Sequence, residues 1–516
     1  MANFITNMKG TLDNRKQLTE NGAVGYSTSG HELLDMNFAI GSLRHESDRQ
    51  IQDRFAKAYY ENPLLAIKFL FKVRDCRGGD GERRTFRVCL DWLIQNKPDV
   101  VKAVLVLIPE YGRWDDLLRL VDTELKSDIA QIAEMQYASD LIGVKNRTNS
   151  ISLIGKWSFS CNCSNKERKR LAKLLIKELH ITEPEYRRML STLRGYLKIV
   201  ERDMCKKEWG NIKYEAVPSR ANLIYNSAFL RNDEERRRKY LASLQKGETK
   251  INASVLFPHD IVNKYTDGWR SIKAQDVALE AMWKALPDYV NGNGNTLVVG
   301  DGSGSMYTRI DPHSNVYAVD VADALAIYFA EHMTGQFANK YITFGGSPHL
   351  VDFSNCKTLR DKITLARKNN DCNNTDIYKV FRLILDTAVR NHMSQEEMPQ
   401  NVLIISDNEY DRMCYFEGRY SNYMSNSSPT LFDGIAAEYS LHGYHLPRLV
   451  FWNVNSRTNT IPVQQNPAGV ALVSGFSPAT CKMVLSNKTD PYDVLLETLN
   501  SERYQKVEDA LKGVEL

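Results

Sequence analysis

The feature that most constrains the fold of this chain is a change in hydrophobic periodicity at residues 291–295, which read NGNGN. Before this segment, from about residue 47 to residue 286, apolar residues recur every three or four positions, the period of amphipathic helices. After it, short continuous apolar runs alternate with helical patterns, which is typical of a parallel sheet covered by helices on both faces. We therefore expect an α-helical domain followed by an α/β domain.

The chain has 516 residues, too many for one compact core, so several domains are expected. We predict an irregular N-terminal arm over 1–45, an α-helical repeat domain over 46–290 and a doubly wound α/β domain over 291–516. The helices of the repeat domain are short and joined by short loops, which favours a HEAT-like solenoid, either an open arc or a closed ring. No repeat of fixed period is visible, so this interpretation depends on helix length alone.

The α/β part contains five apolar runs that we interpret as strands. Polar turns separate them from segments with helical periodicity, as in βαβ units. The predicted strands are 296–300, 341–344, 401–406, 448–452 and 468–473, and the predicted helices are 316–333, 375–392, 435–442 and further helices within 478–513.

Oxygen-bearing side chains follow two of these strands. Asp301, Ser303 and Ser305 follow the first strand in the sequence DGSGS, and Asp407 follows the strand at 401–406. Thr375 lies in a polar loop between them. Parallel strands end at one edge of the sheet, where α/β proteins bind ligands, so we expect these side chains to converge. Carboxylates and hydroxyls with open positions suit Mg²⁺ or Mn²⁺.

The pattern D-x-S-x-S with a distant Thr and a further Asp resembles the metal-ion-dependent adhesion site of von Willebrand factor A domains. The matching positions are Asp301, Ser303, Ser305, Thr375 and Asp407. The resemblance implies a bound Mg²⁺, Mn²⁺ or Ca²⁺ whose remaining position accepts an acidic group from a partner. Two roles stay open for the neighbouring Asp376, which could replace Thr375 at the metal or cap the following helix.

Other interpretations of the DGSGS loop fit less well. It lacks the Gly-Lys-Ser/Thr ending of a phosphate-binding P-loop, and its glycines do not match the G-x-S-x-G elbow of hydrolases. No second Asp stands two residues after Asp301, as a phosphatase nucleophile pattern would require. We therefore expect a binding site and not an enzyme.

Four segments of the helical part stand out: RDCRGGDGERR at 74–84, YGRWDDLL at 111–118, VPSR at 217–220 and LFPHD at 256–260. Through them the helical part resembles a TROVE-like family of unknown function (domain of unknown function 2828), in which a helical-repeat domain precedes a von Willebrand A domain. A more remote resemblance links it to the Ro autoantigen family. That resemblance implies binding of small structured RNAs and of single-stranded RNA ends, without assigning contact residues.

The net charge of +4 conceals an uneven distribution. Residues 145–250 contain 25 Lys and Arg against 12 Asp and Glu, a net of +13, which leaves −9 for the rest. Such a segment is an electrostatic footprint for phosphates, and its aromatic residues could stack on bases. Those aromatic residues are Trp157, Phe159, Tyr186, Tyr196, Trp209 and Tyr214. The candidate RNA-binding residues are Arg74, Arg77, Arg83, Arg84, Arg113, Lys156, Lys166, Arg168, Lys169, Arg170, Arg187 and Arg188.

Structural explanations remain for the same residues. The Gly-rich loop at 74–84 could simply end one helix and start the next, and basic runs could be solvated helix faces. Three functions follow: a non-catalytic RNA-binding protein, a metal-dependent adaptor that binds an acidic partner residue, or a metal-dependent nuclease. The nuclease would need further carboxylates, for which Asp376, Glu409 and Asp411 are candidates.

The location of the protein is inferred from what the sequence lacks. No secretory signal stands at the N-terminus, and no apolar run reaches the length of a bilayer helix. The nine cysteines are odd in number and irregularly spaced, which favours reduced thiols. We expect a soluble, cytoplasmic and monomeric protein.

Overall fold

A computed structural model describes residues 16–267, 271–290, 295–312, 314–412, 430–477 and 480–516. The chain divides into two compact units. The α/β unit contains the described residues up to Asn62 together with Leu256–Asn500, and the helical unit contains Pro63–Val255 and Ser501–Leu516. This division differs from the predicted domain boundaries because each end of the chain belongs to the unit that does not follow or precede it directly in sequence. The first segment packs with the sheet, and the last one packs with the helices.

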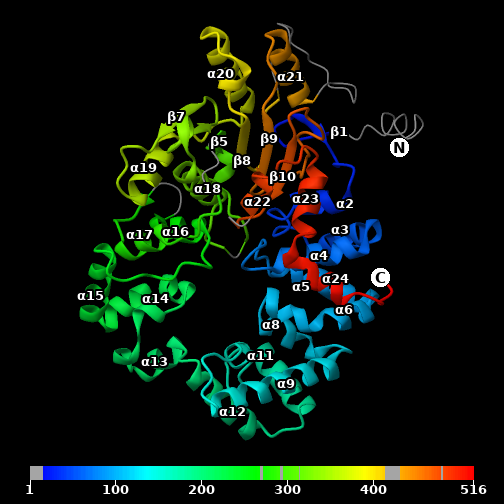
Figure 1. Cartoon of the computed structure of the whole chain (residues 1–516), viewed down its shortest axis with the longest axis vertical. Coiled ribbons are helices and arrows are strands. Elements are labelled where there is room, and N and C mark those ends of the chain that lie inside the picture. The colour runs from blue at the N-terminus through cyan, green and yellow to red at the C-terminus, as the bar shows by residue number, and fades with distance from the viewer. Residues whose placement is uncertain (1–15, 268–270, 291–294, 313, 413–429, 478–479) are drawn as a thin grey trace. The chain divides into compact units, whose positions relative to one another are not determined.

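The α/β unit is built on a six-stranded sheet in the order β10-β9-β8-β5-β6-β7 (Figure 1). All neighbours are parallel except β6 and β7, which are antiparallel. This confirms a parallel-dominated α/β sheet, with strands close to the predicted ranges. The strands are β5 (Thr296–Asp301), β6 (Lys340–Phe344), β7 (His349–Asp352), β8 (Asn401–Ser406), β9 (Arg448–Asn453) and β10 (Val470–Ser474).

Sequence periodicity did not predict the edge strand β7. Only Val351 of its four residues is buried, so it lacks the apolar run that marks a central strand. Helix α18 (Ala318–His332) shows the opposite pattern, because 13 of its residues are buried. It packs on β5 and is buried on all sides, and its two buried acids, Asp320 and Asp323, form ion pairs with Arg367.

The other helices of the α/β unit come from three parts of the chain. The N-terminal residues were expected to be an irregular arm, but the described ones form a hairpin of β1 (Lys16–Leu18) and β2 (Val24–Tyr26), followed by helices. A second two-stranded sheet pairs β3 (Thr266–Asp267) with β4 (Ser271–Ile272). The helices are α2 (Glu32–Phe38), α3 (Asp48–Glu61), α16 (Pro258–Tyr265), α17 (Val277–Lys284), α19 (Leu359–Asn369), α20 (Ile377–Arg390), α21 (Leu431–Leu441), α22 (Cys481–Val484) and α23 (Pro491–Leu499).

The helical unit consists of short helices that pack on their neighbours in sequence, such as α4 on α5 and α14 on α15. A capping box begins α12, because the side chains of Thr182 and Glu185 each accept a hydrogen bond from the backbone amide of the other residue. The main helices are α4 (Pro63–Arg74), α5 (Arg84–Asn96), α6 (Pro98–Val104), α7 (Ile108–Tyr111), α8 (Trp114–Leu118), α9 (Lys126–Lys145), α10 (Ile154–Trp157), α11 (Lys166–Glu178), α12 (Glu183–Tyr196), α13 (Val200–Lys206), α14 (Ser219–Asn232), α15 (Glu234–Gln245) and α24 (Gln505–Ala510).

Two observations bear on the environment of the protein. None of the helices in the described ranges is long and apolar enough to cross a membrane. The eight cysteines that the structure describes are all free thiols.

Candidate metal-binding site

The predicted site lies where the sheet changes direction. From β5 the chain crosses to β6 on one side, whereas β8 lies on the other side of β5 and leads on to β9. The carboxyl ends of β5 and β8 therefore form a topological switch point, the usual ligand-binding position of a doubly wound sheet. Asp301 ends β5 and Asp407 follows β8 directly, so the strand order brings these two carboxylates to the same place.

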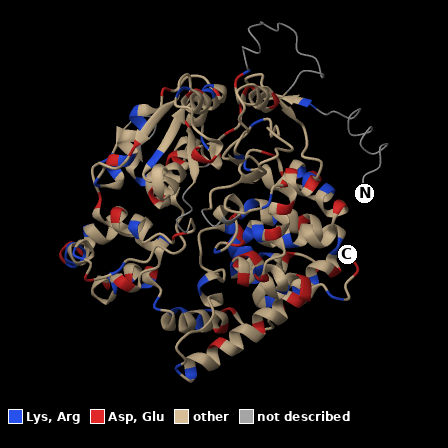
Figure 2. Cartoon of the chain, turned by 45° about the horizontal axis from the view of Figure 1, so that its top comes forward, with Lys and Arg blue, Asp and Glu red and all other residues tan. Residues whose placement is uncertain are grey.

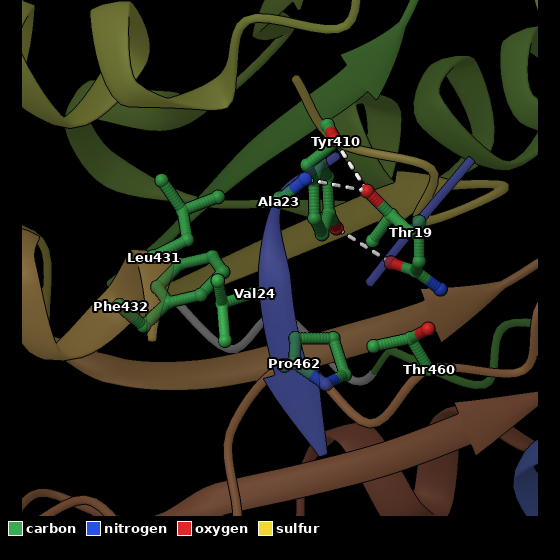
Figure 3. Close-up of a pocket in the computed structure, with 10 residues that line it drawn as sticks. Thr19, Ala23, Val24, Tyr410, Leu431, Phe432, Thr460 and Pro462 are labelled. Carbon is green, nitrogen blue, oxygen red and sulfur yellow. Dashed lines mark hydrogen bonds between the residues drawn. The ribbon is translucent and has the colours of Figure 1, made fainter. Parts of the chain in front are cut away.

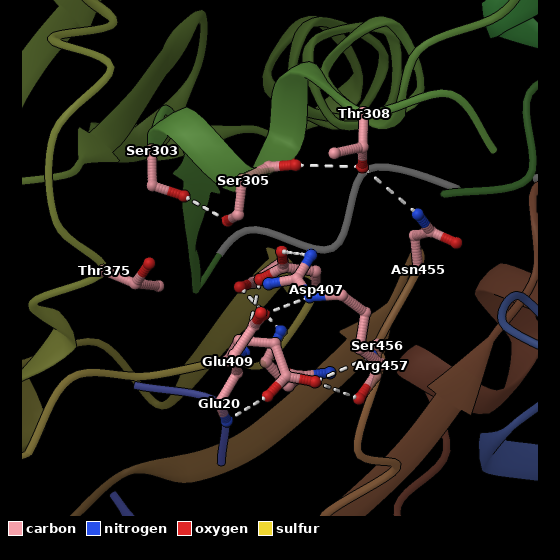
Figure 4. Close-up of polar contacts among 12 residues, drawn as sticks. Glu20, Ser303, Ser305, Thr308, Thr375, Asp407, Glu409, Asn455, Ser456 and Arg457 are labelled. Carbon is pink, nitrogen blue, oxygen red and sulfur yellow. Dashed lines mark hydrogen bonds and ion pairs between the residues drawn. The ribbon is translucent and has the colours of Figure 1, made fainter. Parts of the chain in front are cut away.

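The DGSGS loop folds back on the Asp301 side chain. One carboxylate oxygen of Asp301 accepts a hydrogen bond from the Ser303 amide at 2.9 Å, and the other accepts one from the Ser406 hydroxyl. The hydroxyls of Ser303 and Ser305 lie 3.0 Å apart (Figure 4). Asp301 and Ser303 are fully buried, and Ser305 is half-buried. The loop thus presents one carboxylate and two hydroxyls together, as expected from their alternate spacing.

Burial disfavours the ionised forms of both carboxylates. Burial and the neighbouring Asp407 raise the pKa of Asp301 to about 7. Burial also raises the pKa of Asp407, although Arg457 acts in the opposite direction. Both pKa values are shifted upward because the buried, ionised forms have too little positive charge nearby. A divalent cation would supply that charge, so this pair of acids and hydroxyls fits an oxygen-ligated metal.

Thr375 belongs to a loop that runs beside the DGSGS loop. The amide of Gly304 donates to the Asn373 carbonyl at 3.1 Å, and the Cys372 amide donates to the Gly302 carbonyl at 3.1 Å. Thr375 is buried, and its hydroxyl accepts a hydrogen bond from the Asn21 amide group at 3.3 Å. All five predicted ligand residues therefore belong to adjoining loops at this edge of the sheet.

Asp376 caps helix α20 and is engaged there, because it accepts a hydrogen bond from the Lys379 amide. This decides between its two predicted roles. Asp411 accepts a hydrogen bond from the Thr375 amide at 3.0 Å and so fixes the Thr375 loop. Across the described residues, no group of three or more His, Cys, Asp or Glu side chains has an arrangement that could hold a metal. The candidate set has only two carboxylates, Asp301 and Asp407, and otherwise hydroxyls.

Sequence reasoning missed three residues at this edge: Glu20, Asn21 and Arg457. Glu409 was considered only as a nuclease carboxylate. It is fully buried and accepts hydrogen bonds from the amides of Arg457 at 2.7 Å and Thr458 at 2.8 Å, and from the Ser456 hydroxyl at 2.9 Å. Glu409 therefore fixes the loop after β9 (Figure 4). No local pattern could reveal these partners, because they come from distant parts of the chain.

A small cavity lies between β2 and the sheet and is lined mainly by apolar groups (Figure 3). Its volume is about 10 Å³, enough for one water molecule at most. Val24, Leu431, Phe432 and Pro462 are among its lining residues. The cavity is too small for an organic ligand, so it is a packing feature beneath the N-terminal hairpin.

The structure corrects part of the predicted RNA-binding set. Arg74 is buried, and its Nε donates to Asp116 at 2.8 Å, so it is not accessible to a phosphate. Arg83 and Arg113 form ion pairs with Asp115 at 3.0 and 3.2 Å. The Gly-rich loop is a structural turn, since a side chain at Gly79 would lie 2.0 Å from the Lys72 carbonyl oxygen.

The other basic candidates are more accessible. Of the 25 Lys and Arg residues between 145 and 250, 22 are exposed. Lys and Arg residues are interleaved with Asp and Glu residues along the helices of the chain (Figure 2). Arg170 is exposed but bound to Asp122 and Glu167. Lys156 and Arg84 are half-buried, and the exposed candidates are Arg77, Lys166, Arg168, Lys169, Arg170, Arg187 and Arg188.

The predicted base-stacking role is wrong for three of the aromatic residues. Phe159, Tyr186 and Tyr214 are buried in the helical unit, and the Tyr186 hydroxyl donates to the Phe159 carbonyl. Trp157 is half-buried under the Arg113 guanidinium, which lies 4.2 Å from its ring. Trp209 packs against a core that contains Phe229. These rings are structural, because their apolar faces are already used inside the unit.

Comparison with known proteins identifies two family models along the chain. Residues 19–140 and 166–296 match the "Domain of unknown function (DUF2828)", and residues 295–513 match the "Domain of unknown function (DUF7788)". A relative, "Uncharacterized protein L728" from Acanthamoeba polyphaga mimivirus, is 28% identical over 526 residues, covering 93% of this chain and 86% of its own length. The chain is therefore similar to both families, and the two matched regions adjoin at residues 295–296.

Proposed function

We propose that the α/β unit is a von Willebrand A-type binding module that holds a divalent cation and, through it, an acidic group of a partner protein. The observation that carries this proposal is the meeting of two buried carboxylates with the Ser303 and Ser305 hydroxyls at the switch point of the sheet. The residues that would hold the ion are Asp301, Ser303, Ser305, Thr375 and Asp407. The fold assignment is supported by the strand order, which is that of a doubly wound sheet with one antiparallel edge strand.

The donor chemistry favours Mg²⁺ or Mn²⁺, with Ca²⁺ as an alternative. Hard cations prefer carboxylate and hydroxyl oxygens, and Mg²⁺ keeps part of its hydration shell when few carboxylates bind it. A bound ion would supply an exchangeable position for a partner's carboxylate. Asp376, Glu409 and Asp411 accept hydrogen bonds from backbone amides of the chain, so they act here as structural residues. We therefore propose an adaptor without catalytic turnover.

Replacing Asp301 by Ala should weaken Mn²⁺ binding on the order of 100-fold or more, because it removes a central carboxylate ligand. Isothermal titration of the full chain with Mn²⁺ measures the affinity, and circular dichroism checks the fold. Asp352→Ala is the matched control, since this exposed acid lies on β7 of the same sheet. Equal Mn²⁺ affinity of the Asp301 variant and the wild type would refute the proposed ligand set.

A second candidate function is RNA binding by the helical unit, and one surface favours it. Lys166, Lys169, Lys173 and Lys177 follow one another at helical spacing on α11, and all four are exposed. Among the residues that the structure describes, no hydrogen bond or ion pair engages their ammonium groups. Unpaired lysines in a row suit contacts with successive phosphates. We propose small non-coding RNA or single-stranded RNA ends as the ligand, as the resemblance to TROVE and Ro proteins implies. The packing of successive helices supports a HEAT-like arrangement.

Changing Lys166, Lys169 and Lys173 together to Gln should weaken RNA binding and reduce the salt dependence. For a single strand, the slope of log affinity against log salt should fall by about 0.7 for each lost phosphate contact. Gel shifts with a labelled RNA oligonucleotide at several salt concentrations measure both quantities. Lys357, Lys368 and Lys488 are exposed lysines of the α/β unit, and their triple Gln variant is the control. No RNA binding by the wild type at about 50 mM salt would exclude this function.

A further inference from the structure

The N-terminal hairpin reaches the candidate metal site. Its two strands, β1 and β2, are joined by a turn that contains Glu20 and Asn21. The Thr19 hydroxyl donates to the Tyr410 carbonyl at 2.7 Å, and the Glu20 amide donates to the Glu409 carboxylate at 2.7 Å. These bonds fix the turn beside the segment that carries Asp407. The turn is therefore fixed to the rest of the α/β unit by hydrogen bonds.

Asn21 forms a hydrogen bond with Thr375, one of the proposed metal ligands. Its side-chain amide donates to the Thr375 hydroxyl at 3.3 Å and to the Glu409 carbonyl at 2.7 Å. This N–H donor uses one of the two lone pairs of the Thr375 hydroxyl oxygen, which a cation or a metal-bound water would also use. A residue more than 300 positions away in the sequence thus competes directly for this hydroxyl.

Arg457 forms an ion pair with Asp407, a second proposed metal ligand. Its guanidinium lies 3.3 Å from a carboxylate oxygen of Asp407, and its Nε also binds the Glu20 carboxylate (Figure 4). Arg457 is therefore a positive charge placed between a metal ligand and the N-terminal hairpin. The side chains of Arg457 and Glu20 are 35% and 54% exposed. The surface pair of Arg457 with Glu20 therefore contributes little to stability. The pair that a cation must replace is that of Arg457 with Asp407, whose side chain is 1% exposed, so this buried carboxylate keeps a positive partner only if the cation takes the place of the guanidinium.

We propose that Arg457 and Asn21 close the metal site from within, and that a divalent cation competes with the Arg457 guanidinium for Asp407 and thereby loosens the turn of the N-terminal hairpin at Glu20. This rests on the proposed metal site. A guanidinium and a divalent ion at the same carboxylate repel each other, so the contact of Asp407 with Arg457 and its contact with the ion weaken one another. Glu20 loses its anchored partner when Arg457 moves. Metal occupancy and the position of residues 16–26 are then coupled.

The first test compares Mn²⁺ affinities of full-length variants. Arg457→Gln should bind Mn²⁺ about tenfold more tightly than the wild type, because a competing and repelling charge is removed. Arg382→Gln is the matched control, since Arg382 is 41% exposed and is likewise paired with two carboxylates, Asp386 and Glu438. It should leave the Mn²⁺ affinity unchanged.

The second test needs no change at Arg457. Hydrogen–deuterium exchange of the wild type should show faster exchange in peptides that contain Glu20 and Ala23 when Mn²⁺ is added, because their amides are bonded to Glu409 and Tyr410 in the closed form. Asp407→Asn should abolish this effect of Mn²⁺.

The outcomes separate this inference from the metal site itself. Mn²⁺ binding to the wild type with equal or weaker binding to Arg457→Gln overturns the competition and leaves the metal site in place. Mn²⁺ binding without faster exchange in residues 16–26 also overturns it. Absence of Mn²⁺ binding to both wild type and Arg457→Gln refutes the proposed site, whereas binding only to Arg457→Gln supports a site closed by Arg457.

Discussion

Replacing Asp116 by Ala should lower the free energy of unfolding of the helical unit by about 3–5 kcal/mol, the usual cost of breaking a buried ion pair from one side. Asp116 is fully buried. Its carboxylate accepts hydrogen bonds from the Nε atoms of Arg74 and Arg87, each at 2.8 Å, and from the Arg113 amide at 3.1 Å. The variant leaves the buried guanidinium of Arg74 without its carboxylate, and this uncompensated charge causes the loss.

Urea unfolding of the full chain, followed by hydrogen exchange in peptides of α4 and α8, measures this loss in the helical unit. Asp122→Ala is the control, because Asp122 pairs with Arg170 at the surface, where both side chains are nearly half exposed. Surface pairs of this kind contribute about 0–1 kcal/mol. Equal losses for Asp116→Ala and Asp122→Ala would show that the buried network does not stabilise the unit.

The same residue predicts a pH dependence. Burial by itself would raise the pKa of Asp116, but Arg74 and Arg87 outweigh burial and hold the pKa below its ordinary value of 3.8. A carboxylate with a lowered pKa stabilises the folded state above its unfolded pKa and loses this contribution as the pH falls through the folded value. The wild type should therefore lose stability below about pH 4, and Asp116→Ala should lose less in the same range.

Replacing Glu409 by Ala should cost the α/β unit about 3–5 kcal/mol, which is the second large effect. The Glu409 carboxylate accepts hydrogen bonds from the amides of Glu20, Arg457 and Thr458 and from the hydroxyls of Ser456 and Thr458. Removing it leaves several of these donors without an acceptor in a buried place, and each such donor costs about 1–3 kcal/mol if no water reaches it.

Urea unfolding measures the cost, and exchange of residues 16–26 and 454–460 reports the local consequence. Glu397→Ala is the control, since Glu397 is exposed and accepts one backbone hydrogen bond, from Ser394 at 2.7 Å. Loss of such a cap costs about 1 kcal/mol. A Glu409 variant as stable as Glu397→Ala would mean that Glu409 does not hold the loop after β9.

The central strands were predictable because each is a continuous apolar run with a polar turn at its end. The observed bounds of β8, Asn401–Ser406, are those expected from its sequence. The edge strand β7 was not predictable, because it is buried on one face only and at one residue. Arg74, Phe159, Tyr186 and Tyr214 misled the search for RNA contacts, because sequence shows residue type and not burial.

The α plus α/β class and the concentration of positive charge in residues 145–250 could be read from the sequence alone. The sequence also placed carboxylates and hydroxyls after the strands that end at 301 and 406. These are local properties, since an apolar run and the turn that follows it lie within a few residues. Folding in three dimensions brings Asp301 beside Asp407 and Arg74 to Asp116, and it brings Asn21 and Arg457 to the candidate site. Such pairings join residues tens to hundreds of positions apart, and they depend on strand order and packing, which no short stretch of sequence encodes.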